Sequence, residues 1–394
     1  MRILSIETSC DETALSVVDA QKTADGRLSF SILGNVLASQ IALHREYGGV
    51  FPALAKREHG KAIIPLLLEV LEQAGMKKDA SEQQIIAEEV LEMLSREPEA
   101  QTALQAELAT LAKPDIDLIA VTNGPGLAPA LWVGVSVAKA LATLWDIPVI
   151  GVNHMEGHVL SSLAPTGIQT FETVPITFPA LSLLVSGGHT ELVVMRAFGE
   201  YEKIGQTVDD ACGEAFDKVA RMLELPYPGG PEISRLAELF STNHYPLEAK
   251  SLPSFPRPML HSKNYDFSFS GLKTAVLYYI RDHVAMLNEI DKMAIAHEFQ
   301  NAVVDVLVVK TIRAAQEYNV HDILVGGGVA QNTYLQKVLR DAATDAGFTV
   351  HFPRGDIAGD NALMIAFAGF VEWQKKEKSP DVVGTLRANG TLSL

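Results

Sequence analysis

Two histidines lie four residues apart in the segment NHMEGH, directly after an apolar run that ends at Asn153. Residues at positions i and i+4 share one face of a helix, so the rings of His154 and His158 can bind one ion together. A carboxylate would complete the set, and Asp360 opens a later apolar segment, GDNALMIA. Two imidazoles and one carboxylate leave open positions on a metal for substrate oxygens. Paired histidines are also common as ordinary surface or core residues, so the spacing alone leaves both interpretations open.

The same segment does not fit a zinc protease of the HExxH type. That motif places its glutamate directly after the first histidine, within reach of the metal-bound water. Here Glu156 follows His154 by two positions, which is about 200° around a helix that turns by ~100° per residue. The protease interpretation is therefore disfavoured.

Three glycine-rich turns indicate a second kind of chemistry: VSGGHT (185–190), YPGGPE (227–232) and VGGGVAQN (325–332). Glycine admits positive φ and close backbone approach, so N–H groups in such turns can contact phosphates. No GxxxxGK[ST] or GxGxxG pattern occurs, so each turn is a weak signal by itself. The three together favour a nucleotide cleft between two domains.

The segment 207–223, TVDDACGEAFDKVARML, has the spacing of an amphipathic helix. Phe216, Val219 and Met222 can face a core, and the simple interpretation leaves the charges in solvent. Because the segment lies between two glycine turns, contact of Asp217 with a ribose or a metal is the functional alternative.

The elements that must position these residues alternate between strand and helix. Residues 3–18 and 181–194 both read as strand, polar turn and strand, which predicts two copies of one hairpin and a duplicated domain, although hairpins also resemble one another by chance. Alternation of this kind implies α/β layers with crossover helices. The predicted strands are 116–122, 148–153 and 321–328, the predicted helices are 131–145 and 332–347, and the predicted loops are 161–180 and 251–270.

Composition narrows the class of protein. The 394 residues allow two domains, and 47% apolar with 20% charged residues predicts a packed core. The chain has two cysteines without a CxxC pattern, no apolar run of ~18 residues and no signal-peptide pattern at its start. These features predict a cytoplasmic protein without membrane contact. The net charge of −16 argues against binding nucleic acid over the whole surface, so an RNA substrate would need a local basic patch or a partner.

Eight segments in one order resemble a known family. They are IETSCDET, NHMEGH, LVSGGHTEL, DDACGEAFDKVA, YPGGP, DFSFSGLKTA, VGGGVAQN and GDNALMIA, and they extend from residue 1 to about 375. Together they resemble the universal tRNA threonylcarbamoyltransferase family, the bacterial TsaD proteins once called O-sialoglycoprotease.

The resemblance implies an α/β protein of the actin-like/sugar-kinase fold, with two related RNase H-like domains and a nucleotide cleft between them. We expect the first domain at 1–160 with 357–394 and the second at 178–356. The implied metal ligands are His154, His158 and Asp360. The implied substrate contacts are Leu184, Val185, Ser186, Gly187, Gly188, Asp217, Gly230 and Asn332.

The implied reaction transfers threonylcarbamoyl from threonylcarbamoyl-AMP to N6 of adenosine 37 in ANN-decoding tRNAs, with one divalent metal ion, iron or zinc. Asp11 of the SCDET turn is the candidate proton acceptor. The resemblance also implies a paralogous TsaB-type subunit and a TsaE-type ATPase as partners. A small-molecule kinase of the same fold has no need for the histidine pair, and a non-enzymatic scaffold would lack the His–His–Asp set.

The chain departs from the family pattern at two places. Ala358-Gly359 stand where the family usually has Cys-Thr, which puts a hydroxyl contact near the metal in doubt. Residues 79–112 are an insertion, predicted as a surface helical hairpin. Its first helix begins at Ser81, which forms a capping box with Gln84, and Pro98 lies in the first turn of its second helix. Its two apolar stripes are expected to bury one another. Three basic and eight acidic residues between 78 and 113 give a net charge of −5, which disfavours RNA binding and leaves a partner-docking role and a decorative role open.

Overall fold

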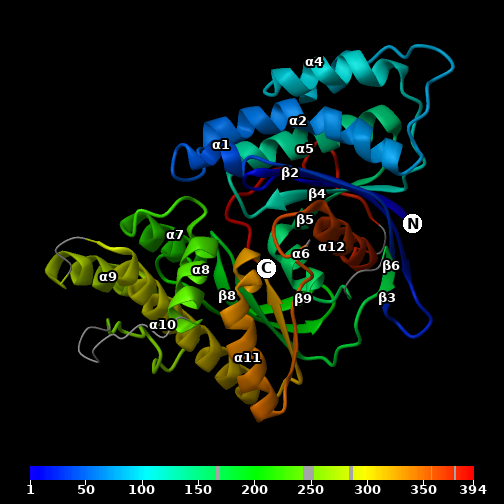
Figure 1. The fold of residues 1–394 in the computed structure, drawn as a ribbon. Coiled ribbons are helices and arrows are strands. Elements are labelled where there is room, and N and C mark those ends of the chain that lie inside the picture. Colours follow the sequence, from blue (N-terminus) through cyan, green and yellow to red (C-terminus); the bar gives the residue numbers. More distant parts are fainter. Residues whose placement is uncertain (166–168, 243–252, 284–286, 356, 377–378) are drawn as a thin grey trace. The chain divides into compact units, whose positions relative to one another are not determined.

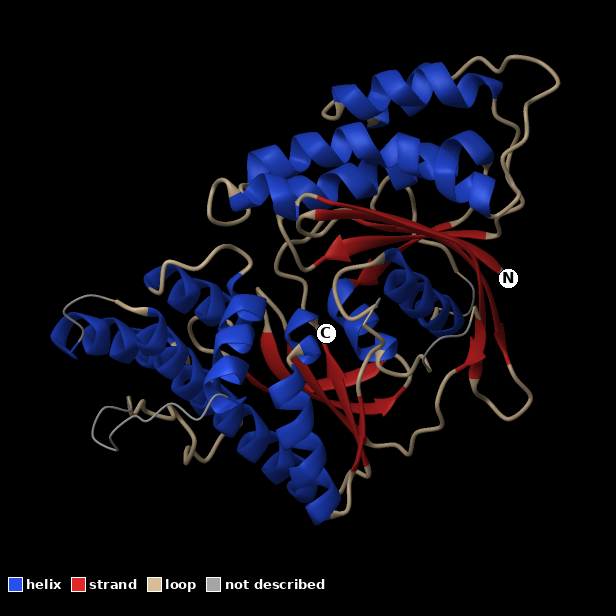
Figure 2. Cartoon of the chain, in the orientation of Figure 1, coloured by secondary structure: helices blue, strands red, loops and turns tan. Residues whose placement is uncertain are grey.

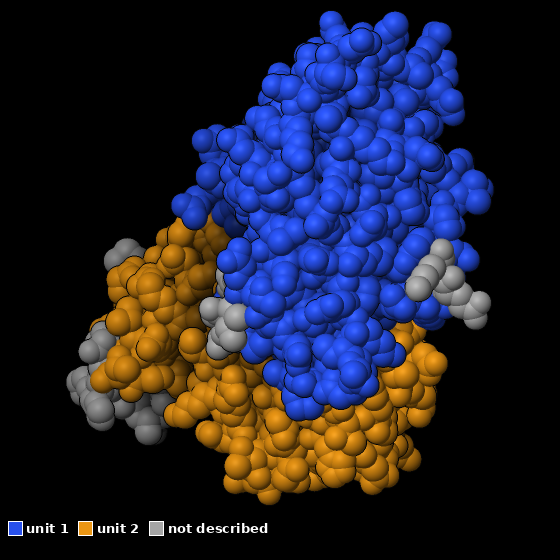
Figure 3. Space-filling model, turned by 90° about the vertical axis from the view of Figure 1, so that its right-hand side faces the viewer, with its two compact units in different colours: residues 1–175, 354–394 blue, residues 176–353 orange. Residues whose placement is uncertain are grey.

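Both predicted hairpins are present in the computed structural model, which describes residues 1–165, 169–242, 253–283, 287–355, 357–376 and 379–394. The chain divides into two units, residues 1–175 with 354–394 and residues 176–353 (Figure 3). Each unit has its own β-sheet with helices packed against it (Figure 2). The fold class is therefore α/β, as predicted, whereas the domain bounds drawn from the sequence stay a prediction.

Unit 1 is built on a six-stranded sheet in the order β5-β4-β1-β2-β3-β6. Strands β1, β2, β3 and β6 are antiparallel neighbours, and β4 and β5 continue the sheet in parallel from β1. The strands are β1 (Arg2–Glu7), β2 (Glu12–Lys22), β3 (Leu28–Ser39), β4 (Leu118–Gly124), β5 (Val149–Asn153) and β6 (Thr170–Glu172).

Helices cover both faces of this sheet (Figure 1). One face packs on α2 (Pro52–Gln73) and α5 (Ala128–Trp145), and the apolar side chains that alternate along β1 and β2 join these helices in one core. The other face packs on α12 (Ala362–Lys375), where Phe30 of β3 contacts Phe367 with ring centroids 4.5 Å apart. The unit also holds the short helix α1 (Ile41–Arg45) and α6 (His154–Ser161).

Helix α5 meets the length and composition of a membrane span, with a mean hydropathy of 1.3 over 18 residues. Because 67% of it is buried inside unit 1 against β4 and α2, we interpret it as a core helix.

The predicted hairpin at 79–112 is only partly correct. Its helices are α3 (Glu88–Met93) and α4 (Pro98–Glu107), followed by the short 3-10 helix η1 (Leu108–Thr110). The helix does not begin at Ser81, because residues 79–84 run extended beside 109–112: Asp79 bridges Leu111, and the Gln84 N–H donates to the Ala109 carbonyl.

The apolar stripes of this insertion also pack differently from the prediction. Helix α4 packs on α2 and α3 packs on α5, so Val90, Leu94 and Leu104 are buried in the core of unit 1. The insertion is therefore part of its host unit and does not form a hairpin that buries itself.

Unit 2 repeats the strand order of unit 1. Its five strands lie in the order β11-β10-β7-β8-β9, with β7, β8 and β9 antiparallel and β10 and β11 parallel to β7. This order matches β5-β4-β1-β2-β3, which confirms the predicted duplication. The strands are β7 (Ala180–Val185), β8 (Thr190–Ala197), β9 (Glu200–Gln206), β10 (Asp322–Gly326) and β11 (Thr349–His351).

Five α-helices accompany this sheet in the part of unit 2 that the structure describes. They are α7 (Cys212–Met222), α8 (Gly229–Thr242), α9 (Ser270–His283), α10 (Glu289–Glu317) and α11 (Thr333–Ala346), with the 3-10 helix η2 (Gly328–Gln331) after β10. The predicted loop at 251–270 is irregular from 253 to 269, and residues 251–252 lie outside the described residues. The predicted loop at 161–180 contains β6, and its residues 166–168 likewise lie outside the description.

Candidate functional site

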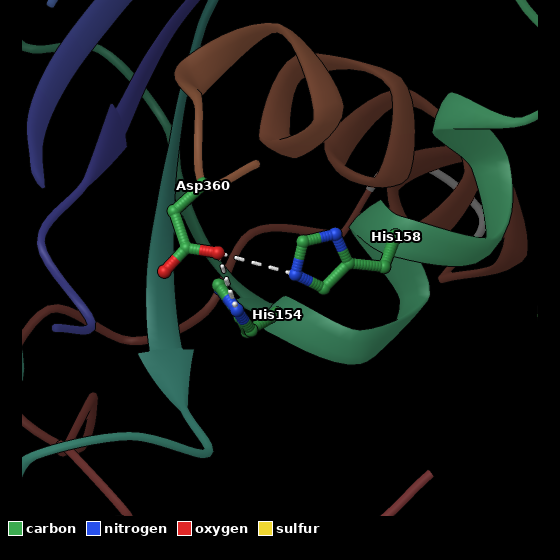
Figure 4. Close-up of side chains that lie close together, drawn as sticks. All are labelled: His154, His158 and Asp360. Carbon is green, nitrogen blue, oxygen red and sulfur yellow. Dashed lines mark ion pairs between the residues drawn. The ribbon is translucent and has the colours of Figure 1, made fainter. Parts of the chain in front are cut away.

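His154 and His158 lie on α6, and Asp360 lies just before α12 (Figure 4). The side chain of Asn153 accepts a hydrogen bond from the Met155 N–H, which starts α6 at the end of β5. The absence of a side chain at Gly157 lets α6 approach α12, since a Cβ there would lie 2.9 Å from Met364 Cγ. The strand, the cap and the glycine therefore bring the predicted ligands together from positions more than 200 residues apart.

The distances within this cluster fit a single metal ion. Asp360 Oδ1 lies 3.4 Å from His154 Nε2 and 3.2 Å from His158 Nε2. In a tetrahedral site with metal–ligand distances of about 2.0–2.1 Å, neighbouring ligand atoms are about 3.3–3.4 Å apart. Burial lowers the pKa of His158, which favours the neutral imidazole, so its Nε2, facing Asp360 Oδ1, can offer a lone pair to an ion.

A fourth residue, Glu7 at the end of β1, orients one of these histidines. Its Oε2 lies 3.1 Å from His154 Nδ1 and accepts a hydrogen bond from Thr122 Oγ1. The carboxylate thus holds the far side of the His154 ring while Nε2 faces Asp360, an arrangement typical of histidine ligands in metal sites. The sequence analysis did not identify Glu7. A charged residue at the end of an otherwise apolar strand is the signal that could have indicated it.

The electrostatics of the cluster favour a positive charge at its centre. Burial alone would lower the pKa of His154, but Asp360 and Glu7 hold that pKa well above its usual value. Burial likewise opposes the charge on Asp360, yet the two histidines lower its pKa below the usual range. The carboxylates of Glu7 and Asp360, on two sides of the His154 ring, therefore favour a positive charge in this buried cluster.

Asp11, the candidate proton acceptor, lies in the turn between β1 and β2. It is buried, and its Oδ2 has no hydrogen-bond partner within the described parts of the chain. Burial and then the charges of Asp11 and Asp360 raise the pKa of Glu12 to about 9, so Glu12 is protonated at neutral pH. The turn therefore places the buried Oδ2 of Asp11 near the protonated carboxyl group of Glu12.

In unit 2, the predicted contacts at 184–188 form the end of β7 and the turn after it. Leu184 and Val185 are buried, whereas Gly187 and Gly188 are exposed and have open space where a Cβ would lie. The turn is rigid, since the Ser186 N–H donates to the His189 carbonyl and the Gly213 N–H donates to the Ser186 carbonyl. A ligand can therefore approach the backbone of Gly187 and Gly188 closely.

The other predicted contacts of unit 2 lie on its helix N-termini. Asp217 Oδ1 accepts a hydrogen bond from the Gly229 N–H, 2.7 Å away, so this carboxylate caps α8 next to Gly230. Asn332 caps α11 through its Oδ1, and its Nδ2 donates to Ser234 and Gln300. Gly327, with φ of 91°, packs against Val185 and so joins the third glycine turn to the first. All three turns of unit 2 are thus adjacent to helix N-termini, which suit anions.

The sequence matches the model of the family TsaD, tRNA N6-adenosine threonylcarbamoyltransferase, over residues 31–87 and 98–367. The chain belongs to this family. The match leaves out residues 88–97, which are α3 and the turn after it, a shorter stretch than the insertion predicted at 79–112.

Bacterial relatives agree with this assignment. The tRNA N6-adenosine threonylcarbamoyltransferase of Burkholderia vietnamiensis is 44% identical over 374 residues, which cover 94% of this chain and 91% of that protein. The enzyme of the same name from Paraburkholderia xenovorans is 43% identical, and the alignment covers 95% of this chain and 93% of that protein. Among solved structures, T. kodakarensis HypF aligns with a TM-score of 0.53 at 14% identity, over 95% of this chain and 48% of that one, which supports the fold alone.

The loop that contains Ala358-Gly359 is held by Asn361, the residue that caps α12. Asn361 Nδ2 donates to the carbonyls of Ile357 and Gly359, at 3.0 and 2.8 Å, while its Oδ1 accepts from the Met364 N–H. Asn361 therefore shapes the loop that carries Asp360, without a hydroxyl at positions 358 and 359.

Proposed function

We propose that this chain transfers the threonylcarbamoyl group from threonylcarbamoyl-AMP to N6 of adenosine 37 in ANN-decoding tRNAs. Membership of the threonylcarbamoyltransferase family supports the reaction. The main structural support for the proposal is the cluster of His154, His158 and Asp360, whose spacing fits one ion. A sugar kinase of the same fold would have no use for that cluster.

His154, His158 and Asp360 would hold a divalent metal ion, iron or zinc. When bound, such an ion supplies Lewis acidity toward phosphate or carbonyl oxygens. The chain contributes the orientation: Glu7 fixes the His154 ring, and Asn361 fixes the loop of Asp360. Three protein ligands leave positions open for substrate oxygens.

Unit 2 would bind the adenylate through its backbone. The open N–H groups of Gly187 and Gly188 are the proposed phosphate contacts, and the N-terminus of α8 at Gly230 adds a positive dipole end. Asp217, whose carboxylate accepts hydrogen bonds from the backbone of Gly229 and Gly230, is the proposed contact for the ribose hydroxyls. Asn332 would act by holding the loop after β10 in place.

Asp11 is the proposed acceptor of the proton that leaves the adenosine amine. Its Oδ2 is buried and has no hydrogen-bond partner within the residues described, so this oxygen is available to accept a proton. The amine is a weak nucleophile, so we expect positioning of both substrates to supply most of the rate.

A net charge of −16 makes help from partners reasonable for a tRNA enzyme. The proposed partners are a paralogous TsaB-type subunit and a TsaE-type ATPase, and the proposed location is the cytoplasm.

A transfer assay tests the proposed function. Purified chain, threonylcarbamoyl-AMP and unmodified ANN-decoding tRNA are combined with and without the two partners, and modified nucleoside is measured by mass spectrometry. Product is expected with partners present. If tRNA stays unmodified in every combination while the adenylate is intact, the proposal is wrong.

The metal ligands are tested by replacing His154, His158 or Asp360 with Ala. Each variant is expected to lose most of its bound metal and its transfer activity, because two ligands hold a divalent ion much more weakly than three. Elemental analysis measures the metal and circular dichroism checks the fold. A variant that keeps full metal occupancy removes that residue from the ligand set.

A further inference from the structure

The loop that joins α1 to α2 carries two exposed aromatic side chains, Tyr47 and Phe51; Figure 1 shows the helices on either side of it. The Tyr47 and Phe51 residues are 63% and 54% exposed, and their rings are stacked with centroids 6.3 Å apart and planes 23° apart. Large apolar side chains rarely remain exposed as an ordered pair without a binding role. The loop turns through Gly48 and Gly49, both at positive φ, which fixes the spacing between the two rings.

This loop is joined by buried hydrogen bonds to the turn that carries Asp11. The Phe51 N–H donates to His44 Nδ1, and His44 Nε2 donates to Gln40 Oε1. The backbone N–H of Gln40 in turn donates to the Asp11 carbonyl, 2.9 Å away. His59 completes the connection from α2, since its Nε2 lies 3.0 Å from the Cys10 carbonyl. A buried network of this kind holds the ring pair in a fixed position relative to the active-site turn.

The segment of chain that carries the rings has more basic than acidic residues, although Lys56 pairs with Glu97, and Arg57 and Lys61 both pair with Glu58. Residues 44–61 contain four basic side chains (Arg45, Lys56, Arg57 and Lys61) and two acidic ones (Glu46 and Glu58), a net of +2 in a protein of net −16. Exposed aromatic rings with basic neighbours are the combination by which proteins bind unpaired bases of RNA.

We infer that Tyr47 and Phe51 form a stacking platform for an unpaired nucleobase of the tRNA loop that contains the target adenosine. The inference rests on the proposed function, because it takes the single-stranded loop of that tRNA as the occupant. A base stacks on the face of the ring pair, and the basic side chains of 44–61 lie near the phosphates that flank it. The platform therefore positions the RNA relative to Asp11 without reading its sequence.

Binding of a fluorescent anticodon stem-loop RNA to the full chain tests the inference, with Tyr47→Ala, Phe51→Ala and Phe51→Leu as variants. Each is expected to raise the Kd for RNA about 5- to 100-fold, because loss of one stacked base costs that much. Phe51→Leu keeps an apolar side chain but has no aromatic face, so it separates stacking from simple burial. Tyr278→Ala, at a 50% exposed tyrosine on α9, is the matched control and is expected to bind RNA normally.

An RNA with an abasic site at each unpaired loop position in turn provides the second arm. At the stacked position, wild type and Phe51→Ala are expected to bind the abasic RNA equally, since the base is already absent. Metal content and adenylate affinity are expected to stay at wild-type levels in all variants.

Unchanged RNA affinity in both ring-to-Ala variants overturns the inference. So does a Phe51→Leu variant that binds RNA like wild type. A loss of transfer in the ring variants while their RNA affinity is unchanged would also overturn it, since the rings would then be a contact with a partner subunit. The proposed function fails separately, in a wild-type chain that leaves tRNA unmodified with its partners.

Discussion

Glu7 orients the ring of His154, one of the proposed metal ligands. Replacing it with Gln removes the charge that holds His154 Nδ1 and leaves the side-chain volume nearly unchanged. We expect metal affinity to fall about 10- to 100-fold, the usual effect of losing such an orienting group. Competition with a calibrated chelator measures this, and thermal unfolding checks the fold. Metal affinity equal to that of wild type would mean that Ser9, whose Oγ lies 3.2 Å from His154 Nδ1, suffices to orient the ring.

At the same scale, Asp217 has two roles that one pair of variants separates. Asp217→Ala removes both the cap on Gly229 and the charge proposed for the ribose, whereas Asp217→Asn keeps an amide oxygen that can still cap. If the charge binds the ribose, both variants lose about 1.5–3 kcal/mol of adenylate affinity by calorimetry. Loss in Asp217→Ala alone would assign the effect to the N-terminus of α8.

At the scale of elements, the insertion at 79–112 is predicted to stabilise unit 1. Leu104 of α4 is fully buried against α2, so Leu104→Ala is expected to lower the free energy of unfolding by about 2–5 kcal/mol. Ile85 in the same insertion is 96% exposed, and Ile85→Ala is expected to change the free energy of unfolding by less than about 0.5 kcal/mol. Chemical denaturation measures both. Equal, small effects would support the freestanding hairpin that the sequence suggested.

Local patterns predicted the two hairpins, three further strands and several helices, but not which elements pack against them. The hairpins at 3–18 and 181–194 were found because alternation and turn residues are local signals. The start at Ser81 was wrong because pairing with 109–112 overrides a local capping preference. Apolar periodicity indicated which face of α4 is buried, but the identity of α2 as its partner depends on tertiary structure. Glu7 meets His154 only because β4 and β5 follow β1 in the sheet, and single-sequence spacing does not contain that order.

At the scale of the whole molecule, the two units differ in how the chain builds them. Residues 176–353 are continuous, whereas unit 1 needs residues 354–394 for α12 and Asp360. We expect fragment 176–353 to unfold cooperatively by itself, and fragment 1–175 to be unstable because the sheet face around Phe30 loses its cover. Adding a peptide of residues 354–394 should restore both the fold and metal binding, measured by circular dichroism and elemental analysis. A cooperative, metal-binding fragment 1–175 would contradict this.

The return of the chain into unit 1 also sets an order of events on the ribosome. The 178 residues from 176 to 353 are synthesised between the two parts of unit 1. At 5–20 residues per second this takes roughly 10–35 s. During that interval the nascent sheet of unit 1 lacks α12, and its open face is available to chaperones or to unwanted contacts with other chains. Asp360 is the last of the three proposed ligands to emerge, so metal capture by the full cluster must follow translation of nearly the whole chain.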